Sequence, residues 1–144
     1  MKLTMSSEMG IHAVWFLATI GTGEPVLSSL VAQGIGVSET YLIKVLKRLV
    51  VSRVLISRKG KKGGYRLRRT PAEISLSDIV IACEGDSEMY SCLHEERACV
   101  NARACPVCAT VDRATRAFYA ELAGTSIADL VAFGWTPELP ADVR

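Results

Sequence analysis

The residues best suited to chemistry in this chain are cysteines. Four of the five lie within the segment CLHEERACVNARACPVC, with intervals of six, five and two residues between them, at Cys92, Cys99, Cys105 and Cys108. Thiolates hold iron–sulfur clusters, whereas a zinc ribbon needs two close pairs of cysteines, and only the last two form one. The segment therefore indicates a metal or redox site. We expect its histidine, His94, to be an ordinary loop residue.

A second source of ligands lies near the start of the chain. Glu8 and His12 are four residues apart in a stretch whose apolar residues recur at helical spacing. Both side chains therefore share one face of the predicted helix. Histidine or a carboxylate can replace a thiolate at a cluster. A solvated Glu–His pair is the simpler alternative, and these residues by themselves leave both open.

The basic residues are concentrated in one part of the chain. Between Thr40 and Thr70 there are eleven Lys or Arg and no Asp or Glu, while the rest carries six basic and fifteen acidic residues. A solvated surface helix normally mixes both signs, so this run favours a polyanionic partner such as nucleic acid. The CPVC sequence at 105–108 would also suit a small thiol oxidoreductase. Such an enzyme has no need of the basic run, and we therefore expect a DNA-binding protein that is not an enzyme.

The elements around the basic run predict a helix-turn-helix. A first helix, capped by Ser6 or Ser7, is expected to end near Ile20. A short helix at Val26–Gln33 and a second one at Ser38–Val51 flank the turn GIGVS. Two short helices joined by a glycine-containing turn are typical of this motif, and the second one is the recognition helix.

Position along the recognition helix predicts what each side chain contacts. Its first turns reach base edges in the major groove, and later residues lie nearer the phosphates. We expect base contacts from Thr40, Tyr41 and Lys44, and phosphate contacts from Lys47 and Arg48.

The stretch VLISRKGKKGGYRLRRT after this helix predicts a β-hairpin. Two short runs with strand character flank GKKGG, whose glycines permit positive φ. A hairpin directly after a recognition helix is the wing of a winged helix. We expect three lysines at its tip to reach the DNA backbone or minor groove: Lys59, Lys61 and Lys62.

Three further helices are predicted after the wing. The first is capped by Ser75 or Ser77 and buries the isolated thiol of Cys83; a longer helix follows at Pro106–Ala123, and a short return helix at 126–131. The winged helix is a closed unit, so the apolar stripe of the long helix needs another partner. A second copy of the chain is the simplest one, and the predicted homodimer contact comprises Val107, Val111, Ala114, Phe118 and Leu122.

The predicted fold class is mostly α with a small β wing. We expect a DNA-binding domain at 1–84, a cluster-binding loop at 85–105, the dimerisation and return helices at 106–132, and a tail at 133–144. No apolar run approaches the roughly 20 residues of a membrane span. Charged and polar residues interrupt the apolar stretch that follows Lys2, so we expect no signal peptide and a cytoplasmic protein.

The chain resembles the Rrf-type bacterial transcription regulators over roughly residues 1–132. The likeness is carried by MKLT, ETYLIKVLKRL, GKKGGYRL, ISLSDIVIACEG, the cysteine segment and TSIADLV. This family includes IscR-, NsrR-, RirA- and RsrR-like repressors. The resemblance implies a dimeric winged-helix regulator, bound to a duplex DNA operator and responsive to an iron–sulfur cluster. Some relatives lack a cluster, so a zinc or thiol/disulfide switch is the alternative.

The resemblance also implies a ligand set. NsrR-like members have an acidic ligand at position 8, and RsrR-like members resemble this chain at both Glu8 and His12. That pattern implies a 2Fe–2S cluster, favoured over 4Fe–4S, between Glu8 and His12 of one subunit and Cys99 and Cys105 of the other. In the alternatives Cys92 replaces His12, or Cys108 completes an all-thiolate set. The first cysteine interval is one residue longer than in IscR-like members, and Cys108 stands where they have a histidine ligand.

Overall fold

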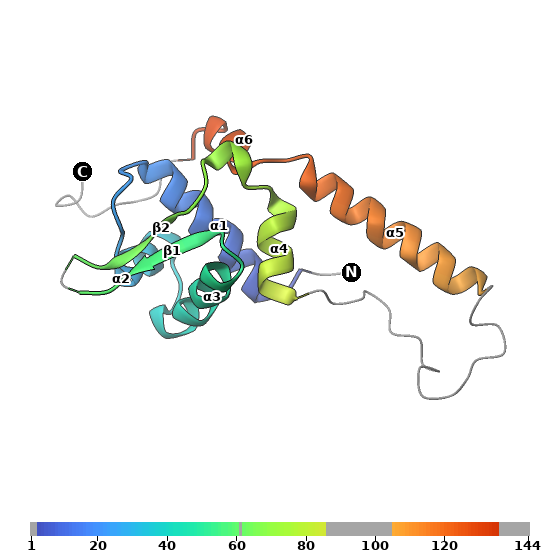
Figure 1. Cartoon of the computed structure of the whole chain (residues 1–144), viewed down its shortest axis with the longest axis horizontal. Helices are drawn as coiled ribbons and strands as arrows, with labels where there is room; N and C mark the ends of the chain where they lie inside the picture. Colours follow the sequence, from blue (N-terminus) through green and yellow to red (C-terminus); the bar gives the residue numbers. More distant parts are fainter. Residues whose placement is uncertain (1–2, 61, 86–104, 136–144) are drawn as a thin grey trace.

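The computed structural model describes residues 3–60, 62–85 and 105–135. Its elements are, in chain order, α1 (Met5–Ile20), α2 (Ser28–Ile35), α3 (Glu39–Val51), β1 (Leu55–Arg58), β2 (Gly64–Leu67), the 3₁₀ helix η1 (Pro71–Glu73), α4 (Leu76–Glu84), α5 (Pro106–Ala123) and α6 (Ile127–Ala132). The first part is a winged-helix body, and α5 extends away from it (Figure 1). The predicted fold class, mostly α with a two-stranded wing, is confirmed.

Helix α1 lies at the centre of the body and contacts α2, α3, α4 and α6. Its buried side chains include Phe16, against which Gly34 of α2 packs so closely that any side chain at Gly34 would overlap the ring. This contact explains why Gly34 lies inside α2 and does not end it. The helix ends at Ile35, followed by Gly36 with φ of 70°, two residues later than predicted.

The start of α2 also differs from the prediction. Val26 exchanges two backbone hydrogen bonds with Tyr65 of the wing, with N–O distances of 2.9 and 2.8 Å. A residue paired in this way is extended, so α2 begins at Ser28 and not at Val26. Similarly, α1 is capped by Thr4, whose hydroxyl accepts from the Ser7 N–H at 3.3 Å, and not by Ser6 or Ser7.

Helix α3 and the wing follow the sequence pattern closely. The apolar stripe of α3 is buried at Leu42, Val45, Leu46 and Leu49. The two strands pair antiparallel from Leu55↔Leu67 to Arg58↔Gly64. Gly64 has φ of 145° and lies against the Val26 backbone, where a side chain could not fit. The wing is therefore fixed to the body through Gly64 and Tyr65 of β2, while Lys59, Gly60 and Lys62 in its turn are exposed.

Helices α4 and α6 close the body on the side opposite the wing tip. Ser75 caps α4 in a capping box with Asp78, and Cys83 is 2% exposed, as predicted for a buried thiol. The α6 helix folds back onto α1 and η1, where Ile127 is fully buried. Among the described residues, no helix is long and apolar enough to cross a membrane.

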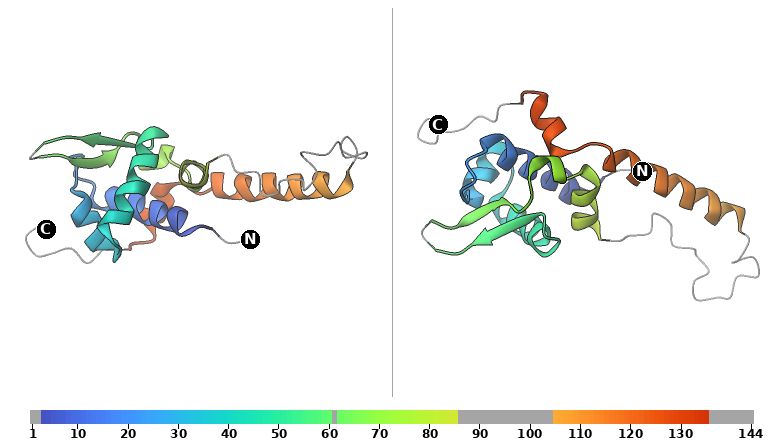
Figure 2. Two further views of the ribbon diagram at one scale, coloured as in Figure 1. Left: turned by 90° about the horizontal axis from the view of Figure 1, so that it is seen from below. Right: turned by 45° about the horizontal axis from the view of Figure 1, so that its top comes forward.

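Helix α5 has the predicted bounds but buries none of its residues. Its C-terminal end joins the body beside α4 and α6, and the rest projects outward, as both views in Figure 2 show. Val107 is 54% exposed and Ala114 is exposed, while Val111, Phe118 and Leu122 are half-buried. No residue of the stripe is fully buried within the described part of the chain.

Candidate DNA interface and ligand-bearing helix

The outward face of α3 carries the residues expected to meet DNA. Thr40, Tyr41, Lys44 and Lys47 are all exposed, on the side opposite the buried stripe. Tyr41 is 39% exposed, and its hydroxyl lies 3.1 Å from the Ser6 Oγ of α1. This contact restrains the phenol and places it beside the start of α1.

The wing and α3 form one basic groove. Lys47 of α3 lines it together with Arg58 and Lys59 of the wing, around a cleft of about 590 Å³. Lys62 is exposed at the tip of the hairpin, and the predicted contact Lys61 lies outside the described residues. With no acidic residue in its lining, the groove suits a phosphodiester chain.

The side chain of Arg48 contacts α4, and Arg48 is not part of the groove lining. Its Nη1 donates to the backbone carbonyl of Cys83 at the end of α4, at 2.6 Å. The guanidinium of this predicted phosphate contact is thus bonded to the end of α4, although Arg48 as a residue is exposed.

Glu8 and His12 lie on the solvent side of α1, one turn apart, and both are exposed. The His12 Nδ1 lies 2.8 Å from the Glu8 carbonyl oxygen. A carbonyl can only accept, so Nδ1 carries a proton, and in the neutral imidazole Nε2 is then the nitrogen with the lone pair. Histidines that bind metals commonly donate their other ring N–H to a backbone carbonyl in this way, which fixes the tautomer.

The indole of Trp15 lies next along this face. Its ring centroid is 6.3 Å from that of His12 and 4.7 Å from that of Trp135. The Trp15 Nε1 is buried and has no hydrogen-bond partner among the described residues. These are the two tryptophans of the chain, so its intrinsic fluorescence reports on the surroundings of His12.

Cys83, Cys105 and Cys108 are in the thiol form. Burial raises the pKa of the Cys83 thiol to about 11, so Cys83 stays neutral and is a poor ligand. Cys105 occupies the N-cap position of α5 without a formal capping hydrogen bond. The backbone N–H of Cys108, then that of Val107 and the Cys108 side chain, lower the pKa of the Cys105 thiol. Cys105 is therefore a better thiolate donor than Cys83.

One chain does not bring these donors together. Glu8 and His12 belong to the body, whereas Cys105 is at the end of α5 that points away from it (Figure 1). Over 18 residues an α-helix is about 27 Å long. Among the described residues no three His, Cys, Asp or Glu converge on a metal position. Cys92, His94 and Cys99 lie outside those residues.

The last turn of α4 is a contact point that sequence reasoning missed. Glu84 Oε1 accepts from the Ser7 hydroxyl at 2.6 Å and from the Thr4 N–H at 3.0 Å. Burial raises the pKa of Glu84, but these hydrogen bonds lower it more, so it lies below the ordinary value. The one available signal was Ser7, a small polar residue on the otherwise apolar side of α1.

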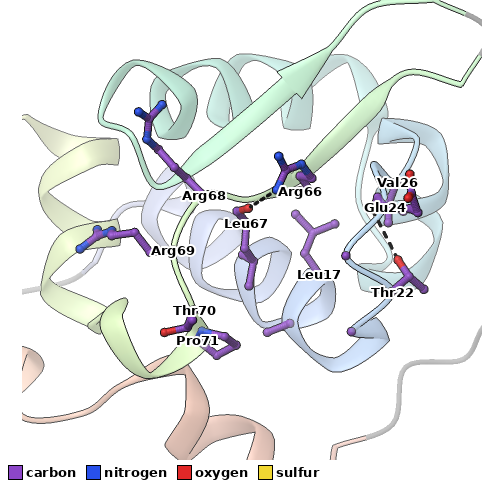
Figure 3. A pocket seen from close by; sticks show the side chains of 13 residues that line it. Leu17, Thr22, Glu24, Val26, Arg66, Leu67, Arg68, Arg69, Thr70 and Pro71 are labelled. Carbon is purple, nitrogen blue, oxygen red and sulfur yellow. Dashed lines mark hydrogen bonds between the residues drawn. The ribbon is translucent and has the colours of Figure 1, made fainter.

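A cavity of about 320 Å³ between the end of α1 and β2 is a weaker candidate site. Leu17, Val26 and Leu67 line it, and the side chains of Arg68 and Arg69 point away from it (Figure 3). Arg69 instead pairs with Asp78 of α4 at 3.2 Å. Glu24 and Arg66 also line the cavity, and the Arg66 Nη1 donates to the Leu67 carbonyl at 3.5 Å.

Comparison with known proteins agrees with this geometry. A family model described as "Rrf2: Iron-dependent Transcriptional regulator" matches residues 3–132. The chain belongs to the Rrf2 family. It is 31% identical over 140 residues to the HTH-type transcriptional repressor NsrR of Streptomyces coelicolor, covering 96% of this chain and 94% of NsrR.

Two solved structures share the fold. T. potens IscR superposes with a TM-score of 0.72 at 22% identity, covering 94% of this chain and 89% of IscR. CymR, the global cysteine regulator of B. subtilis, gives 0.70 at 24%, covering 94% and 99%. Rrf2 proteins are transcription regulators and not enzymes, as predicted for this chain. The closer likeness to RsrR-like members stays a prediction.

Proposed function

We propose that this Rrf2 protein is a dimeric repressor whose affinity for its operator is set by an iron–sulfur cluster. The observation that carries the proposal is the exposed Glu8–His12 pair, in which the bond from Nδ1 to the Glu8 carbonyl leaves Nε2 directed to solvent as a ligand. By comparison, Arg116 and Asp112, another exposed pair one helical turn apart, bond to each other through their side chains. A carboxylate and an oriented imidazole one turn apart have the chemistry of two ligands.

The DNA-binding part of the proposal uses residues 1–84. The exposed residues Thr40, Tyr41 and Lys44 would read base edges, while Lys47, Lys59, Lys61 and Lys62 would contact phosphate. Two copies would present two recognition helices to half-sites about 34 Å apart. A repressor of this kind acts where the DNA is, and we place it in the cytoplasm.

The dimer would be built on 106–132. The uncovered stripe of α5, centred on Phe118, is suited to pack against the same stripe of a second copy. Such an interface would also explain why Cys105 lies far from Glu8 and His12 within one chain, because the α5 of a second copy could bring its Cys105 to the face that carries Glu8 and His12. The segment 85–105, with Cys99, would then be the cluster-binding loop, and 133–144 a tail.

The ligand chemistry fits a 2Fe–2S cluster better than zinc. The donors would be Glu8 and His12 of one subunit with Cys99 and Cys105 of the other, and Cys92 and Cys108 are the alternates. When bound, the cluster supplies a one-electron redox centre. In this chain His12 would offer Nε2, and the N–H groups at the start of α5, which lower the pKa of the Cys105 thiol, would favour its thiolate form.

The first experiment tests for the cluster. Protein purified without oxygen should contain iron and acid-labile sulfide and absorb visible light. Cys99→Ala and Cys105→Ala should be colourless, whereas the matched control Cys83→Ala should keep the chromophore. Loading should also quench the Trp15 fluorescence, less so in His12→Ala. A colourless wild type with stoichiometric zinc would refute the cluster.

The second experiment tests the DNA groove. Lys62→Ala should weaken binding to all duplexes and reduce the log–log salt slope by about 0.9 for each phosphate that is no longer neutralised. Arg113→Ala, a matched removal of charge on α5, should leave the slope unchanged. Equal slopes for wild type and Lys62→Ala would remove the wing tip from the interface.

A third experiment tests control of binding. Oxidised, reduced and cluster-free protein are titrated on one operator at one salt concentration, and we expect at least a tenfold spread in affinity, about 1.4 kcal/mol. His12→Ala should narrow the spread. Equal affinities in all three forms would show that the cluster is not the switch.

One observation favours a second candidate, a thiol/disulfide switch. The Cys108 side chain contacts the Cys105 sulfur across the first turn of α5, and a CxxC pair at a helix start is a common redox couple. Mass spectrometry of alkylated, iron-free protein decides between the two. A Cys105–Cys108 disulfide that changes DNA affinity reversibly would support this candidate over the cluster.

A further inference from the structure

The last turn of α4 joins the helix that carries Glu8 and His12 to the recognition helix. On one side Glu84 accepts hydrogen bonds from Ser7 and Thr4 at the start of α1. On the same side Gly10 packs against Cys83 so tightly that a Cβ there would lie 2.7 Å from Sγ. Gly10 lies between Glu8 and His12 in sequence and faces the opposite way. A shift of the ligand-bearing face of α1 therefore reaches Cys83 directly.

On the other side the same turn is held by the recognition helix. The Arg48 Nη1 donates at 2.6 Å to the Cys83 carbonyl. This oxygen is one of the last carbonyls of α4, which lack partners within the helix and carry the negative end of its dipole. An arginine is well suited to such an end, and the bond is charge-assisted. Arg48 also lines a small apolar depression together with Lys47, Val51 and Ala82.

These contacts make Arg48 different from its neighbour Lys47. Both residues are exposed, but only Lys47 lines the groove between α3 and the wing. Arg48, one residue later, is rotated toward α4 and has its guanidinium committed to Cys83. Both were predicted as phosphate contacts, but only Lys47 is directed toward the groove.

We propose that Arg48 is a positioning residue that couples α1 to the recognition helix through the Cys83 carbonyl, and that it does not contact DNA phosphate. The inference rests on the proposed function, in which ligands bind Glu8 and His12. Packed interiors move as units because they contain little free volume. A displacement of α1 on ligand binding would move the end of α4 and, through Arg48, the angle of α3 in the groove.

The test compares Arg48→Met with Lys47→Met. Methionine keeps most of the apolar stem and removes the charge and the donor in both cases. DNA affinity is measured for loaded and cluster-free forms over a range of salt concentrations. Lys47→Met should reduce the salt slope by about 1.8 per dimer, since each subunit then neutralises one phosphate fewer. It should leave the affinity ratio between loaded and cluster-free protein unchanged.

Arg48→Met should do the opposite. The salt slope of Arg48→Met should match that of wild type. The affinity ratio between loaded and cluster-free protein should be at least about tenfold in wild type and about threefold or less in Arg48→Met. Circular dichroism and urea unfolding check that both variants fold, and Arg48→Lys, which keeps a charged donor, should recover part of the ratio.

The outcomes separate the two proposals. A wild-type ratio near one refutes the cluster switch, and the coupling with it. A wild-type ratio of tenfold that survives in Arg48→Met refutes the coupling alone. A salt slope that falls as much in Arg48→Met as in Lys47→Met shows that Arg48 is a phosphate contact after all.

Discussion

Replacing Gly10 with alanine should destabilise the protein, although alanine is the better helix former. Glycine in a helix is worse than alanine by about 0.5–1 kcal/mol, so an open position would gain stability. At Gly10 the new Cβ would lie 2.7 Å from the Cys83 Sγ and 3.1 Å from the Ile79 Cγ2. Favourable contacts between such atoms occur at about 3.5–4.0 Å, so the sulfur must move by most of an ångström.

The sulfur has little room to move. Cys83 is 2% exposed and Ile79 is fully buried, and overpacking of a well-packed core typically costs about 1–3 kcal/mol. Subtracting the gain in helix propensity leaves a net destabilisation of about 1–2 kcal/mol for Gly10→Ala. For a chain of 144 residues, this lowers Tm by roughly 3–8 °C.

The decisive measurement is a double-mutant cycle with Cys83→Ala. Removing Sγ removes the worse contact, so Gly10→Ala should be neutral or slightly stabilising in that background. The coupling free energy between the two positions should be about 1–2 kcal/mol. Urea unfolding is followed at one protein concentration and one cluster state, because dimerisation and ligand binding both shift apparent stability. An equal destabilisation by Gly10→Ala in both backgrounds would refute the proposed packing of α1 on α4.

Three other outcomes are expected. Burial raises the pKa of Cys83 to about 11 from 9.0, so the unfolded chain loses this proton first, and the free energy of unfolding should fall as pH rises from 9 towards 11. In alkaline urea titrations the free energy of unfolding of Cys83→Ala should fall less steeply than that of wild type. Parallel curves for the two proteins would contradict this. Ser75→Ala removes the N-cap of α4 and should cost about 1 kcal/mol in urea unfolding; unchanged stability would mean that water replaces the cap. Phe118→Glu places a charge in the stripe of α5 and should convert a dimer to a monomer in analytical ultracentrifugation, whereas Arg113→Ala should not; a Phe118→Glu dimer would exclude this stripe as the interface.

Features that depend on near neighbours in the chain could be predicted from the sequence. The buried stripe of α3, Leu42 to Leu49, follows from a spacing of three and four residues. The wing could be predicted because the backbone of GKKGG needs positive φ, which glycine tolerates, and Gly64 has a φ of 145°. The start of α5 at Pro106 follows from the fixed φ of proline.

The ligand-bearing face was also visible, but only as a possibility. The four-residue spacing of Glu8 and His12 places them on one face of any helix. That His12 donates through Nδ1 to the Glu8 carbonyl depends on its side-chain torsions, which spacing does not specify. Spacing also did not specify the side-chain torsions of Arg48. A helical wheel places this residue beside Lys47 near the DNA, whereas its guanidinium bonds to the Cys83 carbonyl.

Contacts between distant segments were decided by the tertiary structure. The start of α2 is set by Val26 pairing with Tyr65, and the bond from Ser7 to Glu84 joins residues 77 positions apart. The direction of Arg48 depends on where α4 ends, 35 residues later. Residue spacing in the sequence predicts the face of a helix on which a side chain lies. The residue that this side chain contacts depends on how the helices pack against one another. The sequence by itself therefore determined the elements of this Rrf2 regulator and the kinds of side chain they carry, and the packing of α1, α3 and α4 decided which of those side chains contact one another.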